Sequence, residues 1–165
     1  MTLPLQALDA AGLVALALSM LVGLRRGRDP ELAAVLLTLL VYFGAAWAAP
    51  TLAPWVPVGT PGSALNLAAA LAFALSTGLV GGWLLGRIPL LLVRRPGTPA
   101  ARVLAAAFGA LRAWVLGLML CTVVTLTPGA QSALWQDSTL ARWLDAGVRG
   151  VQPLLPPDLL RHLAR

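Results

Sequence analysis

Residues 103–127 read VLAAAFGALRAWVLGLMLCTVVTLT, a long apolar run with one charged residue, Arg112. An α-helix needs about 20 consecutive apolar residues to cross the hydrocarbon core of a bilayer. This run has that length, and the Pro128-Gly129 pair that follows it is typical of a helix end. The stretch therefore predicts a transmembrane helix, and it guides the interpretation of the rest of the chain.

Three further apolar runs precede this one, at about residues 5–24, 32–49 and 64–86. Hydrophobic residues make up 59% of the chain and charged residues 11%, whereas a water-soluble domain has about 25% charged residues. We therefore expect an all-α membrane protein, with a four-transmembrane-helix bundle over residues 1–128 and a tail over 129–165. Prolines mark the loop between the second and third runs: Pro50, Pro54, Pro57 and Pro61.

The distribution of arginine predicts the orientation. Arginines are concentrated in the first and third loops, and the second loop has none. Cytoplasmic loops carry an excess of basic residues. A cleaved signal peptide begins with a basic segment, and here the arginines follow the first apolar run, so we expect a retained helix. These features predict a multi-pass protein of the bacterial inner (plasma) membrane with both termini periplasmic. The expected cytoplasmic anchors are Arg25, Arg26, Arg28, Arg94 and Arg95.

The tail contains one segment with helical periodicity, at about residues 138–151. Apolar residues recur there at helical spacing, with charged residues on the opposite face. Asp137 or Ser138 could cap its start. We expect a short extracytoplasmic amphipathic helix, lying on the outer leaflet or folded against the bundle. The alternative is an ordinary extramembrane helix that packs only on its own tail.

Small residues recur every fourth position in three of the runs. The third run has Gly78, Gly82 and Gly86, the fourth has Gly109 and Gly117, and the first ends its series with Gly23. Spacing of four places such residues on one helix face, where they let helix backbones approach closely. We interpret the five glycines of the third and fourth runs as helix-packing positions, within the chain or between chains.

Two ionisable residues lie inside the apolar runs, Asp9 and Arg112. A charged side chain in a membrane is costly and usually has a partner. We expect Arg112 to face the interior with Asp9 as its partner, directly or through water, and Glu31 as the second choice. Arg112 is then either a structural polar contact or a functional residue.

The sequence contains no motif that indicates catalysis, a metal or a cofactor. Metalloprotease, serine hydrolase and P-loop signatures are all missing. The one histidine, His162, lies in the polar tail, and the one cysteine, Cys121, lies in an apolar run where a packing role is expected. We therefore expect no catalytic residues, no metal, no cofactor and no enzymatic activity.

The fourth run opens with Arg102-Val103-Leu104 and continues with Phe108-Gly109-Ala110-Leu111-Arg112. With this block as its most specific part, the sequence resembles the colicin V production protein (CvpA) family of bacterial inner-membrane proteins, in order along nearly the whole chain. The chain departs from the family pattern at Ala101, at Ala113 and at Arg28-Asp29-Pro30. Weaker matches agree in order and spacing: Leu8-Asp9, Gly23-Leu24-Arg25-Arg26-Gly27, Glu31, Trp135, Ser138 and Leu155-Pro156.

The resemblance implies a role in toxin (bacteriocin) production or export, or in envelope homeostasis. Some relatives carry an extracytoplasmic serine protease after the fourth span, which this chain lacks. We expect a non-enzymatic scaffold in the membrane. The alternative is a small oligomeric channel or transporter subunit with Arg112 and Asp9 lining a polar path. The expected partners are the lipid bilayer and either further copies of the chain or other membrane proteins of the envelope or secretion systems, with no nucleic acid.

Overall fold

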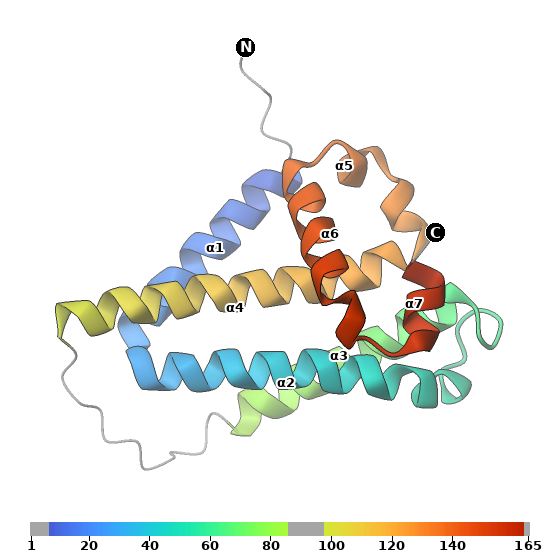
Figure 1. The fold of residues 1–165 in the computed structure, drawn as a ribbon, viewed down its shortest axis with the longest axis horizontal. Helices are drawn as coiled ribbons and strands as arrows, with labels where there is room; N and C mark the ends of the chain where they lie inside the picture. Colours follow the sequence, from blue (N-terminus) through green and yellow to red (C-terminus); the bar gives the residue numbers. More distant parts are fainter. Residues whose placement is uncertain (1–6, 86–97, 164–165) are drawn as a thin grey trace.

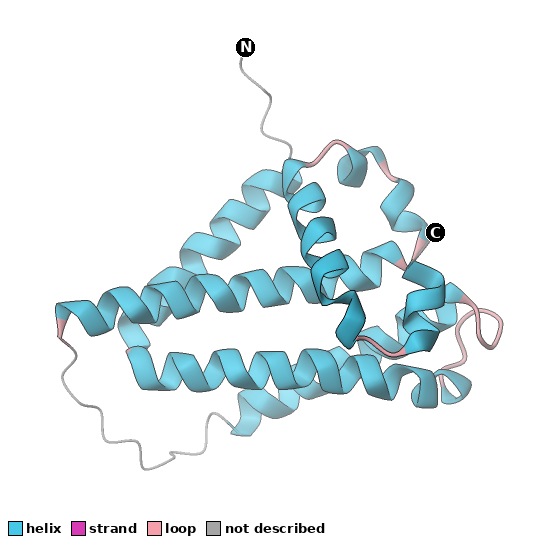
Figure 2. Ribbon diagram, in the orientation of Figure 1, coloured by secondary structure: helices cyan, strands magenta, loops and turns pink. Residues whose placement is uncertain are grey.

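The structure is a computed structural model that describes residues 7–85 and 98–163. Within these ranges all regular structure is helical (Figures 1 and 2). The four long helices are α1 (Ala7–Arg26), α2 (Arg28–Leu52), α3 (Ala64–Leu85) and α4 (Pro99–Thr125). The short ones are η1 (Ala53–Trp55), η2 (Pro128–Gln131), α5 (Ala133–Gln136), α6 (Thr139–Val151), η3 (Gln152–Leu154) and α7 (Pro157–Leu163).

Each of the four long helices is long and apolar enough to cross a membrane. Successive long helices alternate in direction (Figure 1). Many large apolar side chains stay exposed on their outer faces, among them Leu40 on α2 and Val103 on α4. Such a surface suits lipid rather than water. The predicted all-α membrane fold with four spans is confirmed.

Two helices extend beyond the predicted spans. α2 begins at Arg28 and continues through Pro50 to Leu52. α4 begins at Pro99, where the preceding Thr98 hydroxyl accepts a hydrogen bond of 3.3 Å from the N–H of Ala101. Placing Pro50 in the loop after the second run was wrong. Pro99 occupies the first helical position, where proline is favourable, and Pro50 lies in the last turn of its helix, where its missing N–H removes only one bond near the end.

The core lies at the end of the bundle where α2 and α4 end and α3 begins. Side chains from these three helices, α6 and α7 form one buried cluster that includes Tyr42, Leu71, Met119, Leu144 and Leu159. The Tyr42 hydroxyl lies 2.9 Å from the hydroxyl of Thr122, so its polar atom is satisfied inside the cluster. The C-terminal segment is therefore part of the same core as the membrane-spanning helices.

Helix α6 folds against the bundle and contacts both α1 and α4 (Figure 1). Leu140 lies against Gly12 of α1, and Leu144 lies against Gly117 of α4. Ser138 caps the helix, because its hydroxyl accepts a hydrogen bond of 3.1 Å from the N–H of Ala141. Of the expected placements for this amphipathic helix, the structure therefore favours the one in which it is folded against the bundle. The short helices α5 and α7 were not predicted, because so few residues leave no readable periodicity.

Candidate functional site

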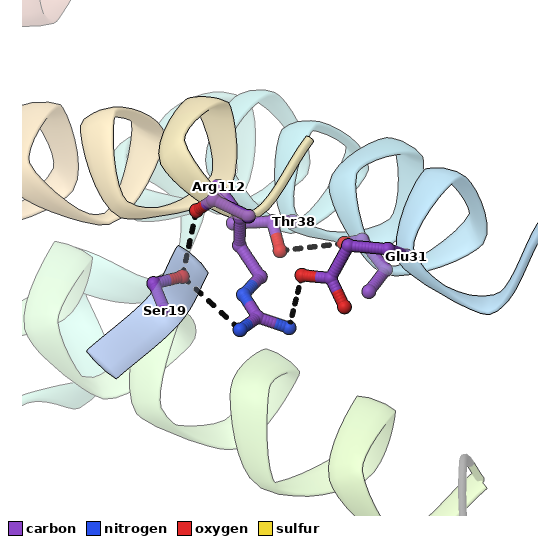
Figure 3. A network of polar contacts seen from close by, with 6 residues as sticks. Ser19, Glu31, Thr38 and Arg112 are labelled. Atoms are coloured by element: carbon purple, nitrogen blue, oxygen red, sulfur yellow. Dashed lines mark hydrogen bonds and ion pairs between the residues drawn. The ribbon is translucent and has the colours of Figure 1, made fainter. Parts of the chain in front are cut away.

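Arg112 lies at the middle of α4, and its guanidinium joins three helices (Figure 3). The Nη1 atom lies 2.7 Å from Glu31 Oε1 on α2. The Nη2 atom donates a hydrogen bond of 3.1 Å to Ser19 Oγ on α1. The Ser19 hydroxyl donates in turn to the backbone carbonyl of Gly109 on α4, at 2.6 Å. One arginine thus connects α1, α2 and α4, and we call these side chains the Arg112 cluster.

The ion pair of this cluster is buried. The exposed fraction of the side chain is 15% for Arg112 and 0% for Glu31. The Arg112–Glu31 contact has the distance of an ion pair but not the geometry of a hydrogen bond, and Glu31 Oε2 has no donor among the described residues. Removing one partner of a buried pair leaves an uncompensated charge and costs about 3–5 kcal/mol. Each charge is therefore needed to keep the other in place.

Close backbone contact between α1 and α4 makes the cluster possible. A Cβ atom added at Gly109 would lie 2.5 Å from the carbonyl oxygen of Ser19. A Cβ atom added at Gly23 would lie 2.3 Å from the carbonyl oxygen of Ala105. Both positions therefore require glycine, and only at this separation can the Ser19 hydroxyl reach the α4 backbone.

The prediction that Asp9 is the partner of Arg112 was wrong. Asp9 precedes Ser19 by almost three turns of α1, about 15 Å along the helix. In an α-helix the Cα–Cβ bonds tilt toward the N-terminus. The Arg112 side chain therefore extends toward the start of α4, where α2 begins with Glu31 and α1 ends. Asp9 lies toward the other end of the bundle, so the second choice, Glu31, is the carboxylate that Arg112 contacts.

Asp9 instead binds the N-terminus of α6. Its Oδ1 atom accepts hydrogen bonds from the Ser138 hydroxyl (2.6 Å) and from the N–H of Leu140 (2.8 Å). Its Oδ2 atom accepts a hydrogen bond of 3.3 Å from the N–H of Thr139. A carboxylate is favourable at a helix N-terminus, where N–H groups have no partner within the helix. Asp9 therefore attaches the C-terminal segment to the first long helix.

The packing glycines lie against neighbouring helices of the same chain. Gly78 and Gly82 face Val41 and Leu37 of α2, and Gly117 faces Leu144. Arg25 and Arg26 lie in the last turn of α1, and Arg28 begins α2 and pairs with Asp29 at 2.9 Å. Three predicted residues lie outside the described ranges: Gly86, Arg94 and Arg95.

Two polar residues of structural importance were not recognised from the sequence. Ser19 was counted only as a small residue, although it links Arg112 to the α4 backbone. Asn66 on α3 donates from Nδ2 to the carbonyl groups of Ala53, Val56 and Val58 at 3.0, 2.9 and 3.1 Å. It holds the proline-rich connection against the start of α3. A polar side chain inside an apolar run is the signal that could have indicated both.

A comparison with known families gives a match over most of the chain. The model of the family described as colicin V production protein matches residues 8–149. The chain belongs to the colicin V production protein family. The resemblance inferred from the Arg102–Arg112 block is thus confirmed.

The family match covers the two polar sites. Residues 8–149 include Asp9, Glu31, Arg112 and Ser138, whereas α7 lies beyond them. No curated protein and no solved structure matched the chain. The chain is thus a membrane protein of the colicin V production family.

The chemistry that the Arg112 cluster offers is ionic and hydrogen-bonding. Within residues 7–85 and 98–163 no group of three or more His, Cys, Asp or Glu side chains could hold a metal ion. Arginine stays protonated in proteins, so the Arg112 side chain donates hydrogen bonds but does not release a proton. The cluster can therefore fix helices or neutralise a buried charge.

Proposed function

We propose that this member of the colicin V production family is a non-enzymatic scaffold in the bacterial inner membrane, which supports toxin production or export, or envelope homeostasis. The observation that carries the proposal is how the chain uses its intramembrane polar groups. Arg112, Glu31 and Ser19 connect α1, α2 and α4, and Asp9 connects α1 to α6. Both sets of contacts hold helices in fixed positions, which is what a platform for other membrane proteins needs.

The outer surface of the bundle also suits a scaffold. Leu13 on α1 and Leu40 on α2 are 58% and 69% exposed, and both lie on long apolar helices. In a membrane such faces contact either lipid or the apolar faces of other transmembrane helices. They offer large surfaces for lateral association without disturbing the interior contacts.

A channel or transporter subunit is the weaker candidate. That reading placed Arg112 and Asp9 along one polar path. Asp9 lies about 15 Å along α1 from Ser19, the α1 residue that Arg112 contacts, and Asp9 is occupied by α6. The Glu31 oxygen without a donor is the observation that keeps this candidate open to test.

A crosslinking experiment tests the scaffold. A photoreactive amino acid would replace Leu40 on the exposed face of α2, with Leu71 in the core as the matched buried control. We expect crosslinking in native membranes to a defined second membrane protein from position 40 and not from position 71. The unmodified 165-residue chain itself, purified and reconstituted in liposomes, should give no ion or solute flux above that of empty liposomes.

Two outcomes would contradict the scaffold. One is measurable flux through liposomes that Glu31→Gln abolishes, because this would assign Glu31 to a conducting path. The other is crosslinking from position 40 only to lipid, with complementation of a deletion strain intact, because the proposed lateral partner would then be missing.

A further inference from the structure

The level at which α6 crosses α4 can be compared with the thickness of a membrane. It contacts α4 at Gly117 and Leu118, and Leu118 lies two turns, about 10 Å, inside the end of α4. α4 has 27 residues, so it is about 40 Å long and exceeds a hydrocarbon core of about 30 Å by about 10 Å. If this excess is shared between both ends, α6 lies about 5 Å below the edge of the core. Interfacial amphipathic helices are buried to about 5–10 Å.

One face of α6 is covered by the bundle and the opposite face is open. Ala141, Leu144 and Val148 are buried against the bundle. Arg142 is exposed, and Trp143 is 66% exposed. Tryptophan is enriched at the level of lipid headgroups. The open face therefore has an aromatic side chain near the edge of the hydrocarbon core and a long cationic side chain that can extend from there toward the headgroups.

Arg142 differs from the other described arginines of the C-terminal segment. Arg149 is paired with Asp145, and Arg161 with Asp158 at 3.6 Å. Among residues 7–85 and 98–163, no carboxylate lies within ion-pair distance of Arg142, and its Nη2 atom donates to the Thr139 hydroxyl at 3.3 Å. The guanidinium therefore has donors free for an external anion.

The carboxylate of Asp9 lies at this end of α6. Its oxygens already accept hydrogen bonds from Ser138, Thr139 and Leu140. Asp9 therefore leaves the charge of Arg142 without a direct ionic contact.

Thr139, Arg142 and Trp143 line a shallow, open hollow on this face. A guanidinium and a hydroxyl supply the N–H and O–H donors that phosphate oxygens accept, and arginine binds phosphate in a bidentate way. We propose that this hollow binds the phosphate group of a phospholipid headgroup, with Arg142 as its ligand and Trp143 against the glycerol region. Lipid binding at this site is a property of α6 in addition to the scaffold role.

The test measures lipid retained by the purified full chain in detergent by native mass spectrometry. The probes are phosphatidylglycerol, a diglucosyl diacylglycerol that lacks phosphate, and inorganic phosphate. We expect phosphatidylglycerol to bind, the glycolipid to bind about tenfold more weakly, and millimolar inorganic phosphate not to displace the bound lipid. The tenfold difference corresponds to one charge-assisted contact.

Variants assign the effect to Arg142. Arg142→Gln should weaken phosphatidylglycerol binding about tenfold, and Arg142→Lys should restore part of it because lysine keeps the charge. Arg149→Gln is the matched control on the same helix, since Arg149 is also exposed but already paired. The melting temperature in detergent checks folding and should stay unchanged, because Arg142 is exposed.

Each contrary result overturns the site. Equal binding of the glycolipid would show that phosphate is not recognised. Displacement by inorganic phosphate would indicate a site for the free ion. Equal losses of phosphatidylglycerol binding in Arg142→Gln and Arg149→Gln would indicate a general charge effect. A photoreactive amino acid at position 143 that crosslinks to a protein rather than to lipid would assign this face to a protein partner.

Discussion

At the scale of single residues, the polar side chains of the membrane-spanning helices have distinct partners. Arg112 contacts Glu31 and Ser19, whereas Asp9 contacts the start of α6. A charge inside a membrane is stable only if the folded protein satisfies it. The partners named here therefore predict which pairs of substitutions compensate each other.

Removing the charges singly and together should separate the observed pair, Arg112 and Glu31, from the expected pair, Arg112 and Asp9. Arg112→Leu should lower the stability of the protein by about 3–5 kcal/mol, because Glu31 is left as an isolated buried charge. Adding Glu31→Leu should recover part of this loss. The measurement is thermal unfolding in detergent, analysed as a double-mutant cycle.

The control for this cycle combines Arg112→Leu with Asp9→Leu. These positions do not contact each other, so their effects should add without recovery. Recovery in the Asp9 combination together with simple addition in the Glu31 combination would show that the pairing described here is incorrect.

Asp9 should govern the docking of α6. Asp9→Ala removes the acceptor of three hydrogen bonds at the start of this helix. We expect faster proteolysis within residues 129–151 in membrane vesicles, at a little-changed total amount of protein. Asp29→Ala is the control, because Asp29 is an acidic residue in the first turn of α2 whose contact is exposed. Equal protease resistance in Asp9→Ala and the parent would show that this contact does not hold α6.

At the scale of helices, the small-residue series do not all act alike. The contacts of Gly23 and Gly109 are with the backbone of the facing helix, whereas Gly78 and Gly82 face the side chains of Val41 and Leu37. A backbone atom cannot move aside without moving its helix, but a side chain can change its rotamer. We therefore expect the α1–α4 contact to be less tolerant of substitution than the α2–α3 contact.

Alanine substitutions test this difference. Gly109→Ala should lower stability by about 1–3 kcal/mol, because its new methyl group would overlap the Ser19 carbonyl oxygen. Gly81→Ala is the matched control, since nothing lies within 4 Å of its added Cβ atom, and it should leave the melting temperature unchanged or slightly higher. If both variants have the same melting temperature as the parent, the close approach of α1 and α4 is not needed for stability.

At the scale of the whole molecule, three of the four long helices, α2, α3 and α4, share one core with the C-terminal segment. α6 lies beside α1 and α4, and α7 contributes Leu159 to the same cluster as Tyr42 and Leu71. The side of the membrane that holds α6 therefore also holds the connection between α2 and α3. Orientation is a property of the entire chain and needs a measurement on the intact membrane.

Cysteine labelling tests the proposed orientation. Single cysteines would replace Val58, which is 40% exposed, and Ala100, which is also exposed, in a Cys121→Ala background that removes the buried native thiol. An impermeant thiol reagent applied to intact spheroplasts should label position 58 and leave position 100 unlabelled, because arginine-rich ends stay in the cytoplasm. The reverse pattern would invert the protein in the membrane.

The sequence by itself determined the membrane class, the four spans, the amphipathic segment at residues 138–151 and the family. Each of these depends on local sums or patterns: hydropathy over about 20 residues, spacing along one helix, or a short block such as residues 102–112. Such signals remain readable without knowing which helices are neighbours. The sequence also indicated that Arg112 needs a partner, because the cost of its charge depends only on its place in an apolar run.

Only the tertiary structure decided which carboxylate is that partner, that α2 continues through Pro50, and that α6 packs against α1 and α4. Pairing depends on how far each helix is shifted along its neighbours and on the direction in which a side chain leaves its helix. Arg112 extends toward the start of α4, so it reaches Glu31, and Asp9 is left free to bind the N-terminus of α6. These relations join residues far apart in the chain, and no pattern along one helix contains them.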